Sequence, residues 1–129
     1  MMNNLLTRGQ LERKIAREIQ AFYCYHLGHQ PSKVSCQILD AKLAVIAEDS
    51  ITNAELILLD LGKNNLAEKV RSDLDSAIRH KLKRLIEEIT QVQVVDLLSG
   101  ATLSTGRTGI IAILDTTPKV RNPHSIPKI

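Results

Sequence analysis

The segment AFYCYHLGHQPSKVSC, residues 21–36, gathers the side chains of this chain that could do chemistry. It holds both cysteines, two of the four histidines and every aromatic residue, so a metal site or a reactive thiol is the first hypothesis to weigh. A structural zinc site needs two pairs of ligands at short fixed spacings. Here the spacing is Cys-x-His-x2-His-x6-Cys, and on a helix Cys24 and His26 would point about 200° apart. The pattern favours a junction between a helix and a strand over a metal site.

Thiol catalysis is no better supported by the same segment. Cys36 falls on the apolar face of an alternating run, which is the usual environment of a buried free cysteine. No acid or asparagine stands where it would plainly orient a histidine toward a thiol. The sequence therefore predicts no catalytic residue, no bound metal and no cofactor, and we expect a protein that is not an enzyme.

A second candidate is the polar stretch LSGATLSTGRTG, which offers Ser104, Thr105, Gly106 and Arg107 together as a cradle for a small anion. The stretch lacks the Gly-Lys-Ser/Thr ending of a phosphate loop. It also leads into a strand, so no helix dipole would aid an anion. A polar hairpin loop is the favoured interpretation, and a small-anion sensor stays as an alternative.

The basic run RHKLKR, from Arg79 to Arg84, raises the alternative of a small nucleic-acid-binding protein. On a helix these charges spread over more than half of the circumference, which is typical of a solvated face. The net charge of +3 comes wholly from Lys119, Arg121 and Lys128 in the tail, because the tail has no acid and residues 1–117 are balanced. A neutral body gives weak support to nucleic-acid binding.

The first half of the chain predicts a helix and a hairpin. From Thr7 onward apolar residues recur at steps of three and four, and Gly28 and Pro31 end that pattern. The alternating runs 33–39 and 42–48 then predict two paired strands.

The second half predicts two helices and another hairpin. Ser50 or Thr52 suits the N-cap of a short helix that ends at Gly62. A long helix restarts at Asn64 or Asn65 and carries an apolar stripe, with Asp75 and Arg79 spaced as an i,i+4 pair. The predicted stripe consists of Leu66, Val70, Leu74, Ile78, Leu82, Leu85 and Ile89. A strand, a loop over residues 99–107 and a last strand over residues 109–115 complete the domain.

The element order α-ββ-α-α-ββ predicts a single α+β domain over residues 1–117. We expect a mainly antiparallel four-stranded sheet packed by the long N-terminal helix and the long central helix. Residues 118–129 form a basic segment with three prolines, which predicts a flexible tail.

The last strand is apolar on both faces, so one face needs cover from outside the domain. We expect a homodimer whose shared face carries Ile110, Ala112 and Leu114. No apolar run in the sequence is long enough to span a bilayer, and the first residues do not read as a signal peptide. These features predict a cytoplasmic protein without direct membrane insertion. The neutral charge of residues 1–117 makes nucleic acid the less favoured partner.

Several phrases of the sequence, taken together, resemble the MpsC-like family over roughly residues 7 to 117. They are the turn GHQP, the helical KVRSDL, the phrase IEEITQVQVVDLLS and STGRTGIIAILD. The family was formerly a domain of unknown function. The resemblance implies a soluble accessory or regulatory component of a Na+-translocating, membrane-potential-generating system linked to ion and inorganic-carbon uptake. It would act by protein–protein binding, with a membrane-complex protein as partner. The resemblance also suggests a shared surface at Gly28, Pro31, Arg71, Thr105 and Gly106. We expect Arg107 to belong to the same partner or ligand surface.

Overall fold

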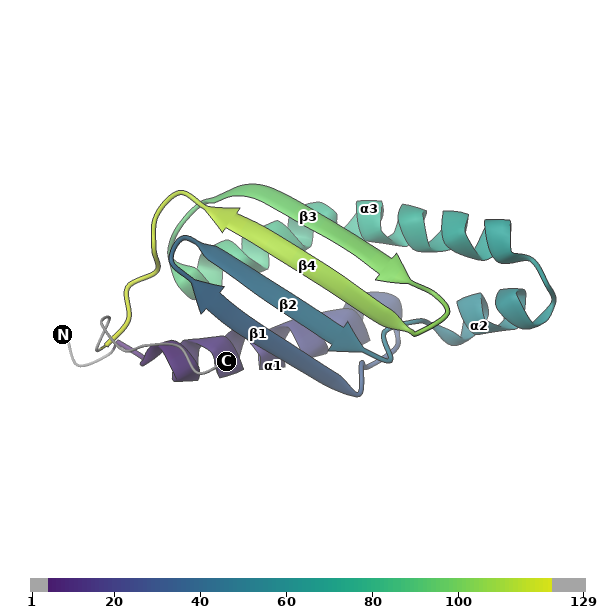
Figure 1. Ribbon diagram of the computed structural model, residues 1–129, viewed down its shortest axis with the longest axis horizontal. Coiled ribbons are helices and arrows are strands. Elements are labelled where there is room, and N and C mark those ends of the chain that lie inside the picture. The colour runs from purple at the N-terminus through teal and green to yellow at the C-terminus, as the bar shows by residue number, and fades with distance from the viewer. Residues whose placement is uncertain (1–4, 122–129) are drawn as a thin grey trace.

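The computed structural model describes residues 5–121 and places two long helices on one face of a sheet (Figure 1). The elements are α1 (Arg8–Leu27), β1 (Lys33–Leu39), β2 (Lys42–Glu48), α2 (Asn53–Asp60), α3 (Asn64–Thr90), β3 (Val94–Thr102) and β4 (Arg107–Leu114). The strands form one antiparallel sheet in the order β1-β2-β4-β3. The predicted single α+β domain and its element order are confirmed.

The first helix begins and ends where its sequence predicts. The Thr7 side chain accepts the Gln10 N–H and the Gln10 side chain accepts the Thr7 N–H, so the two residues form a capping box. At the other end Gly28 takes a left-handed conformation with φ 70°, and its N–H bonds to the Cys24 carbonyl. The GHQP turn then redirects the chain into β1.

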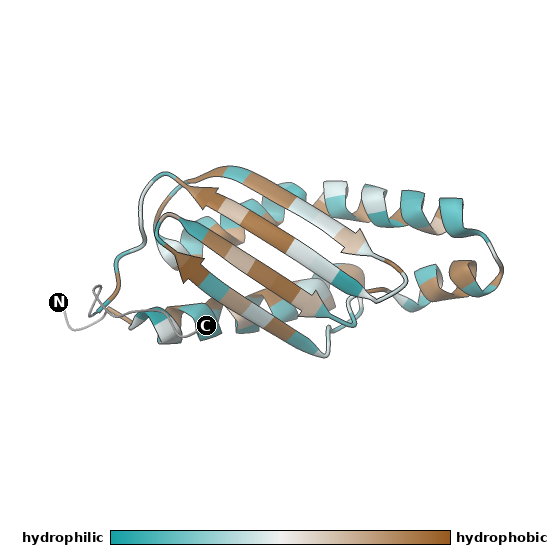
Figure 2. Ribbon diagram, viewed as in Figure 1, coloured by the Kyte–Doolittle hydropathy of each residue, from teal (hydrophilic) through white to brown (hydrophobic). Residues whose placement is uncertain are grey.

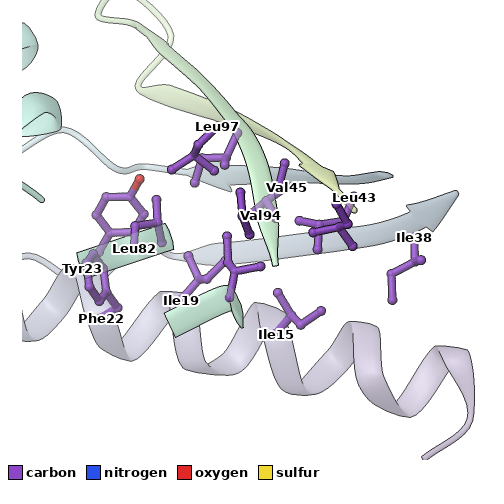
Figure 3. Close-up of a cluster of buried hydrophobic side chains, with 14 of the residues drawn as sticks. Ile15, Ile19, Phe22, Tyr23, Ile38, Leu43, Val45, Leu82, Val94 and Leu97 are labelled. Atoms are coloured by element: carbon purple, nitrogen blue, oxygen red, sulfur yellow. The ribbon is translucent and has the colours of Figure 1, made fainter. Parts of the chain in front are cut away.

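The core lies between the sheet and the two long helices. Figure 3 shows Ile15 and Ile19 of α1, Leu82 of α3 and Val45 of β2 meeting in this layer. Each of these side chains is at most 2% exposed. Burial of one such side chain contributes about 1.5–3 kcal/mol, so this layer supplies most of the favourable free energy of folding.

The buried line of α3 differs from the predicted stripe in its first half. Ile78 and Leu82 are buried as predicted, but Leu66 is exposed while Ala67 and Arg71 are buried. The reason is that α2 and the beginning of α3 extend together beyond the end of the sheet, where they pack against each other (Figure 1). In this half of α3 the buried residues are those that face α2, which contributes a carboxylate as well as apolar groups.

The second hairpin is tighter than predicted. Strand β3 continues through Thr102 and β4 begins at Arg107, so the turn spans residues 103–106 rather than 99–107. Gly106 has φ 74°, a backbone conformation that favours glycine.

The prediction of the dimer face is wrong, because the β4 side chains assigned to it face the helices of the same chain. Ile110, Ala112 and Leu114 are at most 4% exposed because they point toward the helices. The chain itself covers these three side chains. The face left open is the opposite one, which is turned toward the viewer in Figure 2. We call it the outer face of the sheet.

The segment after β4 is attached to the domain as far as it is described. Pro118 is buried, Val120 packs against the core, and the Arg121 N–H donates to the Leu6 carbonyl at 2.7 Å. The boundary predicted at residue 117 is therefore too early, because residues 118–121 belong to the fold. The rest of the predicted tail, residues 122–129 with Lys128, lies outside the described residues.

Candidate functional site

The connection between β2 and α2, residues 49–52, lies at the centre of a buried polar cluster. The Ser50 N–H and hydroxyl both donate to the Gly106 carbonyl, at 2.8 and 3.0 Å. The Ser50 hydroxyl has one proton, so at 2.7 Å it accepts from the Thr108 hydroxyl. Ser50 is 2% exposed and Thr108 is fully buried. These bonds fasten the start of α2 to the turn between β3 and β4.

An ion pair between Arg71 of α3 and Glu55 of α2 forms the charged part of the cluster. Arg71 Nε lies 2.8 Å from Glu55 Oε2, and Arg71 Nη2 lies 2.6 Å from Glu55 Oε1. Nη2 also donates to the Ser50 carbonyl, and Nη1 donates to Asp75, both at 3.1 Å. The guanidinium therefore joins α2, α3 and the 49–52 connection. A bidentate contact of this kind fixes geometry as well as charge.

The position of Glu55 follows from local sequence. The run Thr52-x-x-Glu55 is a capping box, in which the Glu55 carboxylate accepts the Thr52 N–H at 3.1 Å. The Thr52 hydroxyl also donates to Glu55 Oε1, at 2.7 Å. The same carboxylate thus closes the first turn of α2 and receives Arg71.

The environment shifts the pKa values of the two carboxylates of the cluster in opposite directions. Burial acts to raise the pKa of Glu55, but hydrogen bonds from Arg71 and Thr52 outweigh burial and hold the pKa below its ordinary value. Burial raises the pKa of Asp75 above its ordinary value, against the opposing effect of Arg71. Burial, reinforced by Asp75, raises the pKa of Tyr23 on α1 to about 12. At neutral pH the cluster holds ionised Glu55 and Arg71 beside a neutral phenol.

The cluster is suited to fastening elements rather than to proton transfer. The Ser50 hydroxyl bonds to a carbonyl and to another hydroxyl, neither of which acts as a general base. The Glu55 carboxylate is engaged through both oxygens. What the geometry provides is a rigid link between the α2–α3 hairpin and the end of the sheet.

A groove of about 570 Å³ runs beside the cluster, between α3 and the end of β3. Arg79 lines this groove and donates to the Leu97 carbonyl and to the Ser99 hydroxyl. Asp75 pairs with Arg71 instead of with Arg79, the partner that spacing predicted. Arg79 is therefore bound to the sheet edge.

The structure brings several of the predicted surface residues to the same connection. Arg71 and Gly106 both form hydrogen bonds with Ser50. The turn that contains Gly28 and Pro31 approaches from α1, and its His29 ring lies 2.8 Å from the Asp49 carbonyl. Gly28 caps α1 and is exposed, whereas Pro31 is buried.

The remaining two predicted residues lie apart from the cluster. The Thr105 hydroxyl donates to the Thr102 carbonyl within its own turn. Arg107 lies on the outer face, where its Nε donates to Glu48 at 2.7 Å. The side chains of Thr105 and Arg107 therefore do not converge on a common binding site.

The cysteines and histidines of the opening segment are dispersed. Cys24 is exposed, and the His26 ring packs on Phe22 with centroids 4.3 Å apart. Burial, reinforced by Glu12, raises the pKa of Cys36 to about 12. Within residues 5–121 no group of three or more His, Cys, Asp or Glu side chains is placed to hold a metal ion.

Sequence reasoning missed Glu55 and Thr108 as members of the cluster. Two signals point to it. Glu55 ends a capping box, and Arg71 with Asp75 falls on the i,i+4 line that continues the buried Ile78 and Leu82. Charged residues on a buried line require partners, and Glu55 is the acid of the neighbouring helix that meets them.

None of the helices in the described part of the chain combines the length and hydropathy needed to cross a membrane. No curated protein and no solved structure matches this chain. The family model described as "Na+-translocating membrane potential-generating system (MpsC)" matches residues 7–116, which cover the helices, the sheet and the whole polar cluster. The chain therefore belongs to the MpsC family.

Proposed function

We propose that this chain is a non-enzymatic, cytoplasmic accessory component of a Na+-translocating membrane potential-generating system, and that it acts by binding a protein of that system. The proposal rests on the family description together with one structural observation. The segment from α2 to the first turn of α3, residues 53–66, exposes four large aliphatic side chains. We call this segment the α2 arm. Its exposed side chains are Leu56, Ile57, Leu61 and Leu66, at 41%, 58%, 65% and 47%.

Exposed aliphatic residues in such density favour an interaction surface, because soluble proteins seldom leave contiguous apolar patches uncovered. The arm also extends beyond the end of the sheet, where a partner can reach it (Figure 1). The ion pair between Glu55 and Arg71 holds the arm in one orientation. A surface fixed in this way loses little conformational entropy when it binds.

The charges around the arm favour a protein over an anionic lipid surface. Asp60 and Glu68 are balanced by Lys63 and Lys69, and all four side chains are exposed. A helix that lies on an anionic membrane is typically rich in Lys and Arg on its polar face. The partner we propose is therefore an apolar helix or groove on a membrane component of the system.

The alternatives have less support from the geometry. Arg79, at the start of the basic run, is bound to the edge of β3. Arg107, the cation of the proposed anion loop, is paired with Glu48. Neither guanidinium is poised for a phosphate.

Affinity capture from detergent-solubilised membranes of the native host tests the proposal, with three forms of the chain as bait. We expect membrane components of the Na+-translocating system to co-purify with the unmutated chain and with Ile111→Glu on the outer face. Binding should be lost with Ile57→Glu in the α2 arm. Equal recovery with Ile57→Glu would contradict the proposal. Binding of the pure chain to anionic vesicles would identify a lipid surface instead, and steeply salt-dependent binding to duplex DNA would favour the nucleic-acid alternative.

A further inference from the structure

The outer face of the sheet has an alternating arrangement of large and small residues at its centre. Ala44 of β2 lies opposite Ile111 of β4, and one step along the strands Ile46 lies opposite Gly109. The two isoleucines therefore occupy diagonal corners of a square, and the alanine and glycine occupy the other two. Ile46 is 44% exposed and Ile111 is 39% exposed.

Strand β3 adds a large residue beside Ile111 and a small one beside Gly109. Leu98, which is 56% exposed, pairs with Ile111, and Gly100 pairs with Gly109. Large residues thus project beside a shallow strip formed by two adjacent glycines.

The backbone conformation does not explain why residues 100 and 109 are glycine. Neither has a positive φ. A Cβ at Gly100 would meet no atom within 4 Å, and a Cβ at Gly109 would make an ordinary 3.7 Å contact with Ile46. Glycine weakens a strand and often marks a place where another backbone or side chain approaches closely. The strip therefore leaves room for a group from outside this chain.

We propose that a second copy of this chain stacks its outer face on the same face, with the two-fold axis over the centre of the square. Two sheets that pack face to face keep their strands roughly aligned. With the axis along the strands, Ile46 faces Gly109 of the second copy and Ile111 faces Ala44. With the axis across the strands, Ile46 faces Ala44 and Ile111 faces Gly109. In both arrangements Ile46 and Ile111 enter the space above a small residue, so the centre of the face is self-complementary.

The charges at the ends of the face agree with this pairing. Glu48 and Arg107 form an exposed pair at one end, and Lys42 and Asp96 lie at the other. Glu48 would face Arg107 of the second copy with the axis along the strands, and Lys42 with the axis across them. Like charges are kept apart in both cases. An apolar centre with a charged rim is the usual anatomy of a protein interface.

Light scattering on the full chain at tens of micromolar tests the proposal, which is independent of the function proposed for the α2 arm. We expect the mass of a dimer for the unmutated chain, and a halved mass for Ile111→Glu. Leu56→Glu is the matched control, because Leu56 is 41% exposed but lies on the α2 arm. It should leave the dimer intact.

Gly109→Leu provides a second variant if Ile111→Glu fails to fold. The new side chain fills the space that receives an isoleucine of the second copy, so the mass should again be halved while the thermal unfolding transition remains cooperative. A monomeric mass for the unmutated chain would overturn the proposal. A dimer that persists in both outer-face variants, or one that only Leu56→Glu separates, would also overturn it.

Discussion

Arg71 and Glu55 form a bidentate ion pair that is closed to solvent, with side-chain exposures of 5% and 0%. The pair lies where α2 and α3 leave the sheet, and it shares Ser50 with the turn between β3 and β4. The charges therefore fix the orientation of the α2 arm. Removing one partner of a buried pair leaves an uncompensated charge, whereas replacing both can be nearly neutral.

Arg71→Met should lower the free energy of unfolding by about 3–5 kcal/mol, because the Glu55 carboxylate is then buried without its cationic partner. The double variant with Glu55→Leu should recover a substantial part of that loss, since no buried carboxylate remains on α2. Urea unfolding followed by circular dichroism measures both. Lys69→Met is the control, because Lys69 pairs with Asp73 on the surface of the same helix, and it should leave stability nearly unchanged. A double variant as unstable as Arg71→Met would show that the pair itself contributes the stability.

The two carboxylates should affect the acid side of the stability curve in opposite directions. The pKa of Glu55 is lowered in the folded state, so its contribution is complete above the unfolded pKa and is lost as the pH falls through the folded pKa. The pKa of Asp75 is raised, so its contribution is present below the unfolded pKa and is lost as the pH rises through the folded pKa.

Urea titrations between neutral pH and about pH 3 measure these slopes. Stability should fall less steeply with acid in Glu55→Gln than in the unmutated chain. It should fall more steeply in Asp75→Asn, which lacks the compensating proton uptake. The same change of slope in both variants would show that the two pKa values do not move apart.

Most of the fold could be predicted because local signals and apolar periodicity agree. Thr7 and Gly28 define both ends of α1, and the alternation of β1 and β2 fixes which residues face the helices. The predictions were wrong where tertiary contacts determine which side chains are buried. Periodicity placed Leu66 on the buried line of α3, but that half packs on α2 and buries Arg71 instead. For β4 both faces are apolar, so the sequence could not show which one the helices cover.

The polar cluster was only partly predictable. Arg71 and Gly106 were expected at a shared surface, yet their common partner Ser50 appears only when the turn after β3 folds back beside β2. That contact joins residues more than fifty positions apart, and no local pattern encodes it. The capping-box spacing from Thr52 could have identified Glu55, but its second role requires α3 to lie across it.

Truncation after Thr117 should destabilise the domain, contrary to the expectation of a freely flexible tail. It removes the buried Pro118, the contact of Val120 with the core and the hydrogen bond from Arg121 to Leu6. We expect a loss of about 1–3 kcal/mol, the range for burying an aliphatic side chain together with one hydrogen bond. Differential scanning calorimetry of the two chain lengths measures this loss, with Lys119→Ala in the full chain as an exposed control. Superimposable transitions would restore the boundary at residue 117.

The two cysteines should differ strongly in reactivity, which tests the placement of α1 against β1. Cys24 is exposed on α1, whereas Cys36 is half-buried on β1 and packs against the core. Burial, with the nearby Glu12, raises the pKa of Cys36 to about 12. At mildly alkaline pH its thiolate fraction is then on the order of one in ten thousand, and the thiolate is the reactive form.

Iodoacetamide should therefore modify Cys24 at least about a hundredfold faster than Cys36 in the folded chain. Peptide mass spectrometry over a time course gives both rates. In denaturant the two rates should converge, because the burial of Cys36 is lost. Cys24→Ser isolates the slow site, and its alkylation rate should rise when Arg71→Met loosens the fold. Equal rates for the two thiols in the native chain would mean that β1 does not pack against α1 as described.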